Sequence, residues 1–96
     1  MYKIAGIYHN GKEGTRWDLR KDDKHDGLRG CFVKFNPNDV KLMNNAIFKF
    51  CMHPLYQEWC SDEKIIGFWH KRGELNGNDL FFLETVNTIY ILEELR

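Results

Sequence analysis

The sequence has no net charge and no long apolar run. Its 96 residues contain 14 Lys plus Arg and 14 Asp plus Glu, so the formal net charge is zero. A neutral chain lacks the attraction on which polybasic nucleic-acid binders depend, and it also lacks the acidity of a DNA mimic. The apolar run at residues 80–83 is far too short to span a bilayer. We therefore expect no membrane association, and nucleic acid is an unfavoured partner.

The sequence contains three cysteines, an odd number, at Cys31, Cys51 and Cys60. Secreted domains of this size usually pair an even set of cysteines into disulfides. The sequence also has no Asn-x-Ser/Thr glycosylation acceptor and opens without an apolar leader. These absences favour a reducing compartment, so we predict a cytoplasmic location.

The common signatures of catalysis and phosphate binding are absent as well. The sequence contains no GxGxxG, GxxxxGK[ST], GxSxG or HExxH pattern. We therefore predict a protein that is not an enzyme and that uses no cofactor.

Enough apolar residues are present to form a core. Hydrophobic residues make up 43% of the sequence and aromatic residues 15%, which is more than a disordered chain carries. At this length one core and one domain are expected. We predict a single domain over residues 1–96.

Strand patterns and turn signals cover most of the sequence. Two Asn-Gly pairs, at residues 10–11 and 76–77, predict hairpin turns because both residues accept positive φ angles. Residues 89–92 also fit a helical turn, but Ile and Tyr there favour a strand. The predicted strands lie at residues 2–8, 14–19, 28–35, 65–72, 79–85 and 89–92.

One helix is predicted after residue 35. Asn36 can cap it, Pro37 fits its first turn, and Asp39 complements the positive end of its dipole. Helical spacing predicts a buried stripe that ends before Pro54 and comprises Val40, Met43, Ile47, Phe50 and Cys51. The predicted fold class is therefore α+β: a mostly antiparallel sheet of five to six strands, in the order β-β-β-α-β-β-β, with one principal helix packed on it.

Two sets of residues resemble metal ligands. Cys51, His53, Cys60 and His70 are competent zinc ligands, but only the first pair is short, and Cys51 already belongs to the helix stripe. The acidic loop at residues 22–26 also contains a histidine, yet its neighbouring Lys and Arg residues favour a solvated, charge-paired loop. We predict no bound metal and keep the four Cys and His residues as weak candidates.

Large aromatic residues exceed what one helix on one sheet has to bury. Trp and Tyr are enriched at binding hot spots because they bury a large area at a low entropy cost. Tyr56 and Trp59 are expected in a short helical turn, and Trp69 shares a strand face with Lys71. The predicted interface residues are Trp17, Trp59, Trp69, Tyr56 and Lys71.

These features favour a small protein-binding module whose partner is another protein. A narrower hypothesis, suggested by the size and by eight asparagines, is a viral, phage-type inhibitor that blocks a host protein by occlusion. One alternative is a nucleic-acid-binding protein that uses the basic N-terminal hairpin with Trp69 and Lys71. A second alternative is a small metal-dependent enzyme built on Cys51, His53, Cys60 and His70.

Overall fold

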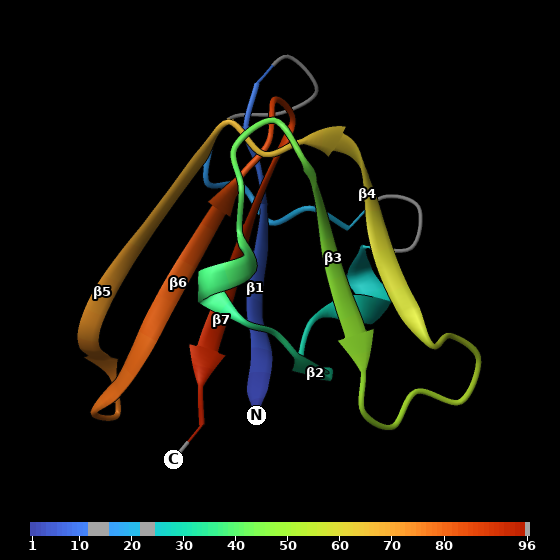
Figure 1. Ribbon diagram of the computed structural model, residues 1–96, viewed down its shortest axis with the longest axis vertical. Helices are drawn as coiled ribbons and strands as arrows, with labels where there is room; N and C mark the ends of the chain where they lie inside the picture. The colour runs from blue at the N-terminus through green and yellow to red at the C-terminus, as the bar shows by residue number, and fades with distance from the viewer. Residues whose placement is uncertain (12–15, 22–24, 96) are drawn as a thin grey trace.

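A computed structural model describes residues 1–11, 16–21 and 25–95 of the chain. These residues form one seven-stranded sheet in the order β4-β3-β2-β1-β7-β6-β5 (Figure 1). All its ladders are antiparallel. The strands are Tyr2–His9 (β1), Phe32–Lys34 (β2), Asn45–Phe50 (β3), Glu58–Lys64 (β4), Gly67–Leu75 (β5), Asn78–Glu84 (β6) and Thr88–Glu94 (β7). The helical segments in this part of the chain are two 3-10 turns, Asp26–Leu28 (η1) and Pro37–Asp39 (η2).

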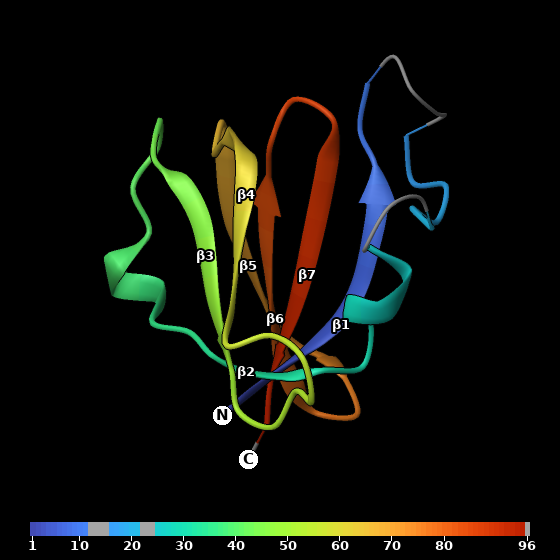
Figure 2. The same cartoon turned by 90° about the vertical axis from the view of Figure 1, so that its right-hand side faces the viewer.

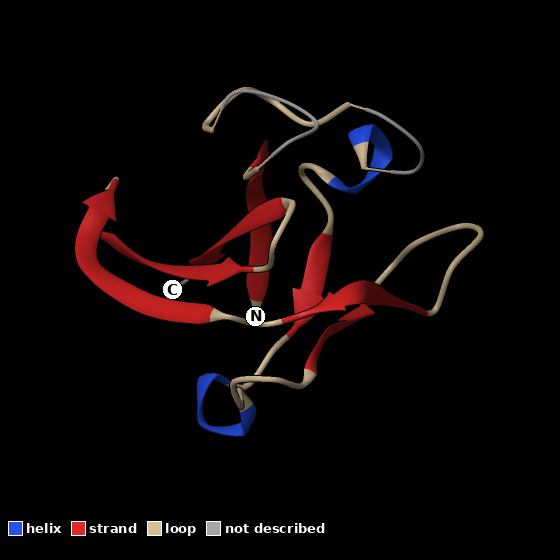
Figure 3. Cartoon of the chain, turned by 90° about the horizontal axis from the view of Figure 1, so that it is seen from above, coloured by secondary structure: helices blue, strands red, loops and turns tan. Residues whose placement is uncertain are grey.

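The sheet is rolled into two halves that meet at β1 and β2. β1 pairs with β2 on one side and with β7 on the other, while the edge strands β4 and β5 are joined by residues 65–66. The short strand β2 runs across the lower part of the molecule (Figure 2). From above, β5, β6 and β7 curve along one side and β3 and β4 lie on the other (Figure 3). The inner faces of the two halves therefore share one core.

The core combines residues from both halves of the sheet. β2 covers residues 32–34 of the strand predicted at residues 28–35, and along it Val33 is buried while Phe32 and Lys34 are exposed. The buried core cluster comprises Ile4, Ile7, Leu28, Val33, Ala46, Phe48, Ile65, Phe81, Leu83, Tyr90 and Leu92.

The predicted α+β fold with a principal helix is wrong. The cap itself forms, since Asn36 Oδ1 accepts a hydrogen bond from the Asn38 backbone N–H at 3.0 Å, but the turn ends at Asp39. Met43 has a left-handed φ of +71°, which a right-handed helix does not allow. The chain then enters β3, so the expected stripe is not a buried helix face.

Other predicted elements have mixed outcomes. The Asn76-Gly77 hairpin is confirmed, with φ angles of +51° and +80°, and residues 89–92 lie within strand β7 as favoured. The helical turn predicted around Tyr56 and Trp59 is wrong, because Trp59 lies in β4. Of the return strand predicted at residues 14–19, residues 14–15 lie outside the described residues. Residues 16–19 of this predicted strand contribute one isolated β-bridge, between Tyr8 and Leu19.

The expected acidic loop lies partly outside the described residues, at positions 22–24. Its next residue, His25, is buried, in contrast to the solvated loop that was expected. Among the helical segments that the structure describes, none has the length and apolar character needed to cross a membrane.

Tyr2 leads to a prediction about alkaline stability. Its hydroxyl donates a hydrogen bond to Glu94 Oε2 at 3.1 Å, and burial together with this carboxylate raises the pKa of Tyr2 from 10.0 to about 12. Because the folded state holds the proton more tightly, the stabilisation is fully present below pH 10 and is lost as the pH rises through about 12.

We therefore expect Tyr2→Phe to remove part of the stability loss between pH 10 and 12. Urea unfolding at several alkaline pH values measures this difference, and tyrosinate absorbance follows the titration itself. An identical pH dependence in Tyr2→Phe and the wild type would contradict the prediction.

Candidate functional site

The outer face of the half formed by β1, β7, β6 and β5 is a candidate binding surface. The inner faces of these strands supply core residues, so the alternate residues point outward. The ladder registers align them in three rows, Lys3-Glu93-Leu80-Lys71, Gly6-Ile91-Phe82-Trp69 and Tyr8-Ile89-Glu84-Gly67.

Phe82 is the centre of an aromatic group on this face. The Trp69 ring stacks on Phe82 with centroids 5.0 Å apart and planes 6° from parallel. Trp17 meets Phe82 edge-on at 6.3 Å and meets Tyr8 at 5.7 Å. We call Tyr8, Trp17, Trp69 and Phe82 the outer aromatic cluster. Phe82 is only 6% exposed although it lies outside the core cluster, so these rings form a second apolar group.

Gly6 allows the Tyr8 ring to lie against the sheet. A Cβ atom at position 6 would be 2.6 Å from Tyr8 Cε2, which is shorter than any van der Waals contact. A side chain at this position would therefore displace the ring. The absence of one at Gly6 helps to shape the outer aromatic cluster.

Backbone hydrogen bonds hold Trp17 beside β1. The Trp17 N–H donates to the His9 carbonyl oxygen at 3.1 Å, and the His9 N–H donates to the Asp18 carbonyl oxygen at 2.8 Å. Trp17 has a left-handed φ of +74° and is 45% exposed. Such a conformation is strained for a side chain of this size and persists where the surroundings impose it, often at functional sites.

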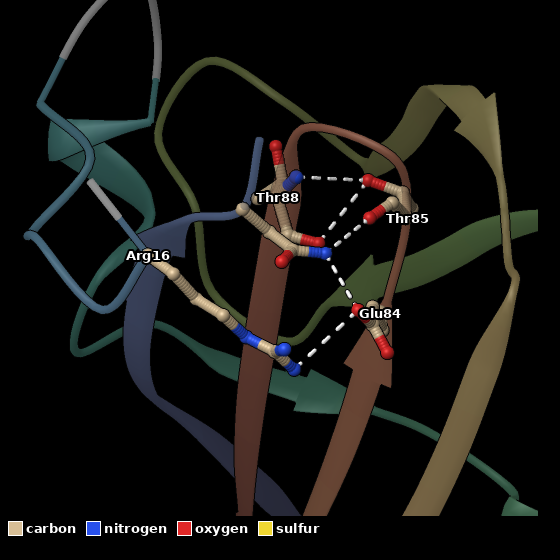
Figure 4. Close-up of polar contacts among 5 residues, drawn as sticks. Arg16, Glu84, Thr85 and Thr88 are labelled. Atoms are coloured by element: carbon tan, nitrogen blue, oxygen red, sulfur yellow. Dashed lines mark hydrogen bonds and ion pairs between the residues drawn. The ribbon is translucent and has the colours of Figure 1, made fainter. Parts of the chain in front are cut away.

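A polar network anchors the same segment to the end of β6 (Figure 4). Asn10 Nδ2 donates to Glu84 Oε2 at 2.7 Å and to the Thr85 carbonyl oxygen at 2.8 Å. Arg16 Nη2 forms an ion pair with the same Glu84 oxygen at 3.5 Å. The Thr88 N–H donates to Thr85 Oγ1 at 3.1 Å, which closes the turn between β6 and β7. The network therefore places the segments on both sides of Trp17 next to the end of β6, with Arg16 contributing an exposed ion pair.

Charges on this face are close to balanced. Lys71 Nζ lies 5.6 Å from the Phe82 ring centroid and Arg16 Cζ lies 5.7 Å from the Trp17 ring centroid. Cations at this distance are attracted to aromatic faces. Lys3 adds a third positive charge, and Glu84 and Glu93 add two negative ones at the row positions given above. The face is amphipathic and not strongly basic.

The structure brings together three of the five predicted interface residues. Trp17, Trp69 and Lys71 all contact Phe82. Trp59 instead packs against the core and donates from Nε1 to the Tyr90 hydroxyl at 3.3 Å. Tyr56 lies in the loop between β3 and β4, where its ring is 4.9 Å from His53.

The weak metal candidates are not brought together. Cys51 and His53 follow β3, Cys60 lies on β4, and His70 lies on β5. His53 Nδ1 accepts hydrogen bonds from the backbone N–H groups of Leu55 and Tyr56, and His70 Nε2 lies 3.0 Å from Asp79 Oδ2. Within the residues that the structure describes, no group of three or more His, Cys, Asp or Glu side chains is placed to hold a metal ion.

Sequence reasoning missed Phe82 and Tyr8 as members of the candidate site. Residues 80–83 are all apolar, so their pattern does not show that Phe82 faces away from the core residues Phe81 and Leu83. Which strand would bring a partner for Phe82 depends on the register of β5 with β6. Sequence alternation alone does not specify that register.

Comparisons with known proteins identified no relative of this chain. No protein-family model, no curated protein and no solved structure matches this chain.

Proposed function

We propose that this protein binds another protein through the outer aromatic cluster, with Trp17 as the anchor residue. The observation that carries the proposal is a tryptophan that is 45% exposed and has a left-handed φ of +74°. Solvent exposure of so large a ring gains nothing for folding. A rigid, pre-positioned Trp beside an Arg is typical of an interface hot spot.

The charge balance favours a protein partner over nucleic acid. A phosphate backbone needs a clear excess of Lys and Arg, whereas Glu84 and Glu93 nearly offset the cations of this face. Stacking of bases also needs open ring faces. Phe82 is 6% exposed because Trp69 covers one side of its ring.

In this role the protein covers a surface of its partner, and no catalytic step takes place. A cytoplasmic location is part of it, supported by three free cysteines. The narrower hypothesis of a viral inhibitor of a host protein stays a prediction.

The test is capture of a partner followed by affinity measurement with purified components. We expect Trp17→Ala to weaken binding at least tenfold, because an anchoring Trp usually contributes more than about 1.4 kcal/mol. Because the Trp17 ring also packs on Tyr8 and Phe82, this variant should melt at a lower temperature than the wild type, and binding is measured at a temperature where circular dichroism shows both proteins folded. Trp69→Ala should weaken the same complex.

The matched control is Leu55→Ala, because Leu55 is 78% exposed and lies in the loop between β3 and β4. This variant should bind as the wild type does. The proposal is wrong if Leu55→Ala loses the partner while Trp17→Ala keeps it. Submicromolar binding of single-stranded DNA or RNA with a steep salt dependence would replace it with the nucleic-acid alternative.

A further inference from the structure

A cavity of about 760 Å³ is lined by residues of β3 and of the segment that carries η2. This segment lies beside β3 in Figure 1. Its floor reaches the core at Ala46, Ile65 and Leu83, whose exposed fractions are 2%, 2% and 0%. Its volume falls within the range of about 300–1,000 Å³ that is usual for small-molecule sites. The cavity lies away from the outer aromatic cluster and shares no residue with it.

The cavity exists because β2 is short. β2 pairs with β3 only through Val33 with Phe50 and Lys34 with Lys49. Residues 45–48 of β3 therefore have no β2 partner on that side. The segment at residues 35–44 arches over this gap in the sheet and does not fill it.

The rim of the cavity is strongly basic. The four lysines that line it are Lys34, Lys41, Lys49 and Lys64, whereas Asp39 is the one acidic residue among its lining residues. Within the described part of the chain, no ion pair joins any of these lysines to an acid. Lys34 and Lys49 are directly opposite each other in the β2–β3 ladder. Like charges in this position repel each other and destabilise a sheet.

The wall above the floor is apolar and contains a strained residue. Met43, Val40 and Ile47 line it. Met43 is 62% exposed and has a left-handed φ of +71°, so the backbone there is held against its own preference. The flexible thioether of methionine adapts well to apolar ligands.

We infer that this cavity binds an amphiphilic carboxylate, with its apolar chain on the floor and its carboxylate between Lys34 and Lys49. Charge complementarity selects the anion, since a carboxylate at the rim would offset the repulsion of two opposed lysines. The buried apolar floor selects a ligand with a hydrocarbon body. The ligand class is therefore a medium-chain fatty acid.

Isothermal titration of the full chain with decanoate tests the inference. We expect one equivalent to bind, while the uncharged decanol and the cationic decyltrimethylammonium bind at least tenfold more weakly. Inorganic phosphate alone should produce no binding heat. Decanol that binds as tightly as decanoate, stoichiometric binding of phosphate alone, or no decanoate binding at millimolar concentration would each overturn the inference.

The double variant Lys34→Gln with Lys49→Gln separates a ligand site from a structural role. It should bind decanoate at least tenfold more weakly, and its ligand-free melting temperature should be equal to or higher than that of the wild type, because the repulsion is removed. A purely structural pair would lower the melting temperature instead. Lys21→Gln, at an exposed position outside the cavity, is the control and should bind normally. Unchanged decanoate affinity in the double variant would show that the inference is wrong.

Discussion

Replacing Phe48 with alanine should lower the free energy of unfolding by about 3–5 kcal/mol, the usual loss when a large ring leaves a filled core. Phe48 is 0% exposed. Its ring contacts Tyr90 edge-on at 5.3 Å and Phe35 at 6.2 Å. It therefore joins β3 to β7 across the rolled sheet, so the cavity left by alanine would lie between the two halves.

The adjacent residue provides the matched control. Ile47 is 53% exposed and points away from the core, so Ile47→Ala should change the free energy of unfolding by no more than about 0.5 kcal/mol. Urea unfolding of both variants measures the difference. A buried helix stripe containing Ile47 predicts the opposite order. A loss in Ile47→Ala that equals or exceeds the loss in Phe48→Ala would therefore reject the strand assignment.

The contrast between these two residues explains why the helix was predicted wrongly. Residues 40, 43, 47 and 50 match a helical period, but residues 46, 48 and 50 match a strand period equally well in the same window. Asn44 and Asn45 are poor helix formers that compete with the backbone for hydrogen bonds. The Asn36 cap was predicted correctly, but one cap cannot offset the cost of helix nucleation without a buried face.

The second of the two Asn-Gly turn signals located its strands well, whereas the strand predicted after Asn10-Gly11 forms only the Tyr8–Leu19 bridge among the described residues. Both strands around Asn76-Gly77 occur near the expected positions, because the turn joins them directly. A register shift between Lys71 and Leu75 separates this turn from the Trp69–Phe82 pair. β4 was missed, since Glu58–Lys64 has four exposed residues and few apolar ones. Its strand character comes from pairing with β3 and not from its own composition.

The candidate site was likewise predicted only in part. Trp17, Trp69 and Lys71 were chosen from residue type, and the sheet places all three around Phe82. Their convergence depends on the β5–β6 register and on the bridge that joins Tyr8 to Leu19. The local sequence signals neither the register shift in the β5–β6 ladder nor the pairing of Leu19 with Tyr8. Residue type therefore suggested members of the site, but the geometry required the folded sheet.

Gly11→Ala should also have a large effect, because this glycine anchors the Trp17 segment to the turn between β6 and β7. Gly11 has a φ of +130°, and an added Cβ would be 2.7 Å from the Val86 carbonyl oxygen. That oxygen belongs to the backbone, so it cannot rotate away as a side chain would. Backbone strain of roughly 1–3 kcal/mol and overpacking of similar size together predict a loss of about 3 kcal/mol.

Two other glycines separate these contributions when all three variants are compared by urea unfolding. Gly77 has a φ of +80° with no atom within 4 Å of an added Cβ, so Gly77→Ala should show strain alone, about 1–2 kcal/mol. Gly27 has neither a positive φ nor a close neighbour, and Gly27→Ala should stay within about 0.5 kcal/mol of the wild type.

The same change at Gly11 should reach the candidate site through Asn10. Asn10 donates from its backbone N–H to the Asn87 carbonyl oxygen at 2.9 Å and from its side chain to Glu84. If alanine at position 11 pushes the chain away from Val86, these bonds lengthen and Trp17 loses its support on Phe82. Tryptophan emission of the folded Gly11→Ala variant should then shift towards that of a solvated ring. If the Gly11→Ala variant had the emission of the wild type and were as stable as Gly27→Ala, the Gly11 contact would not anchor Trp17.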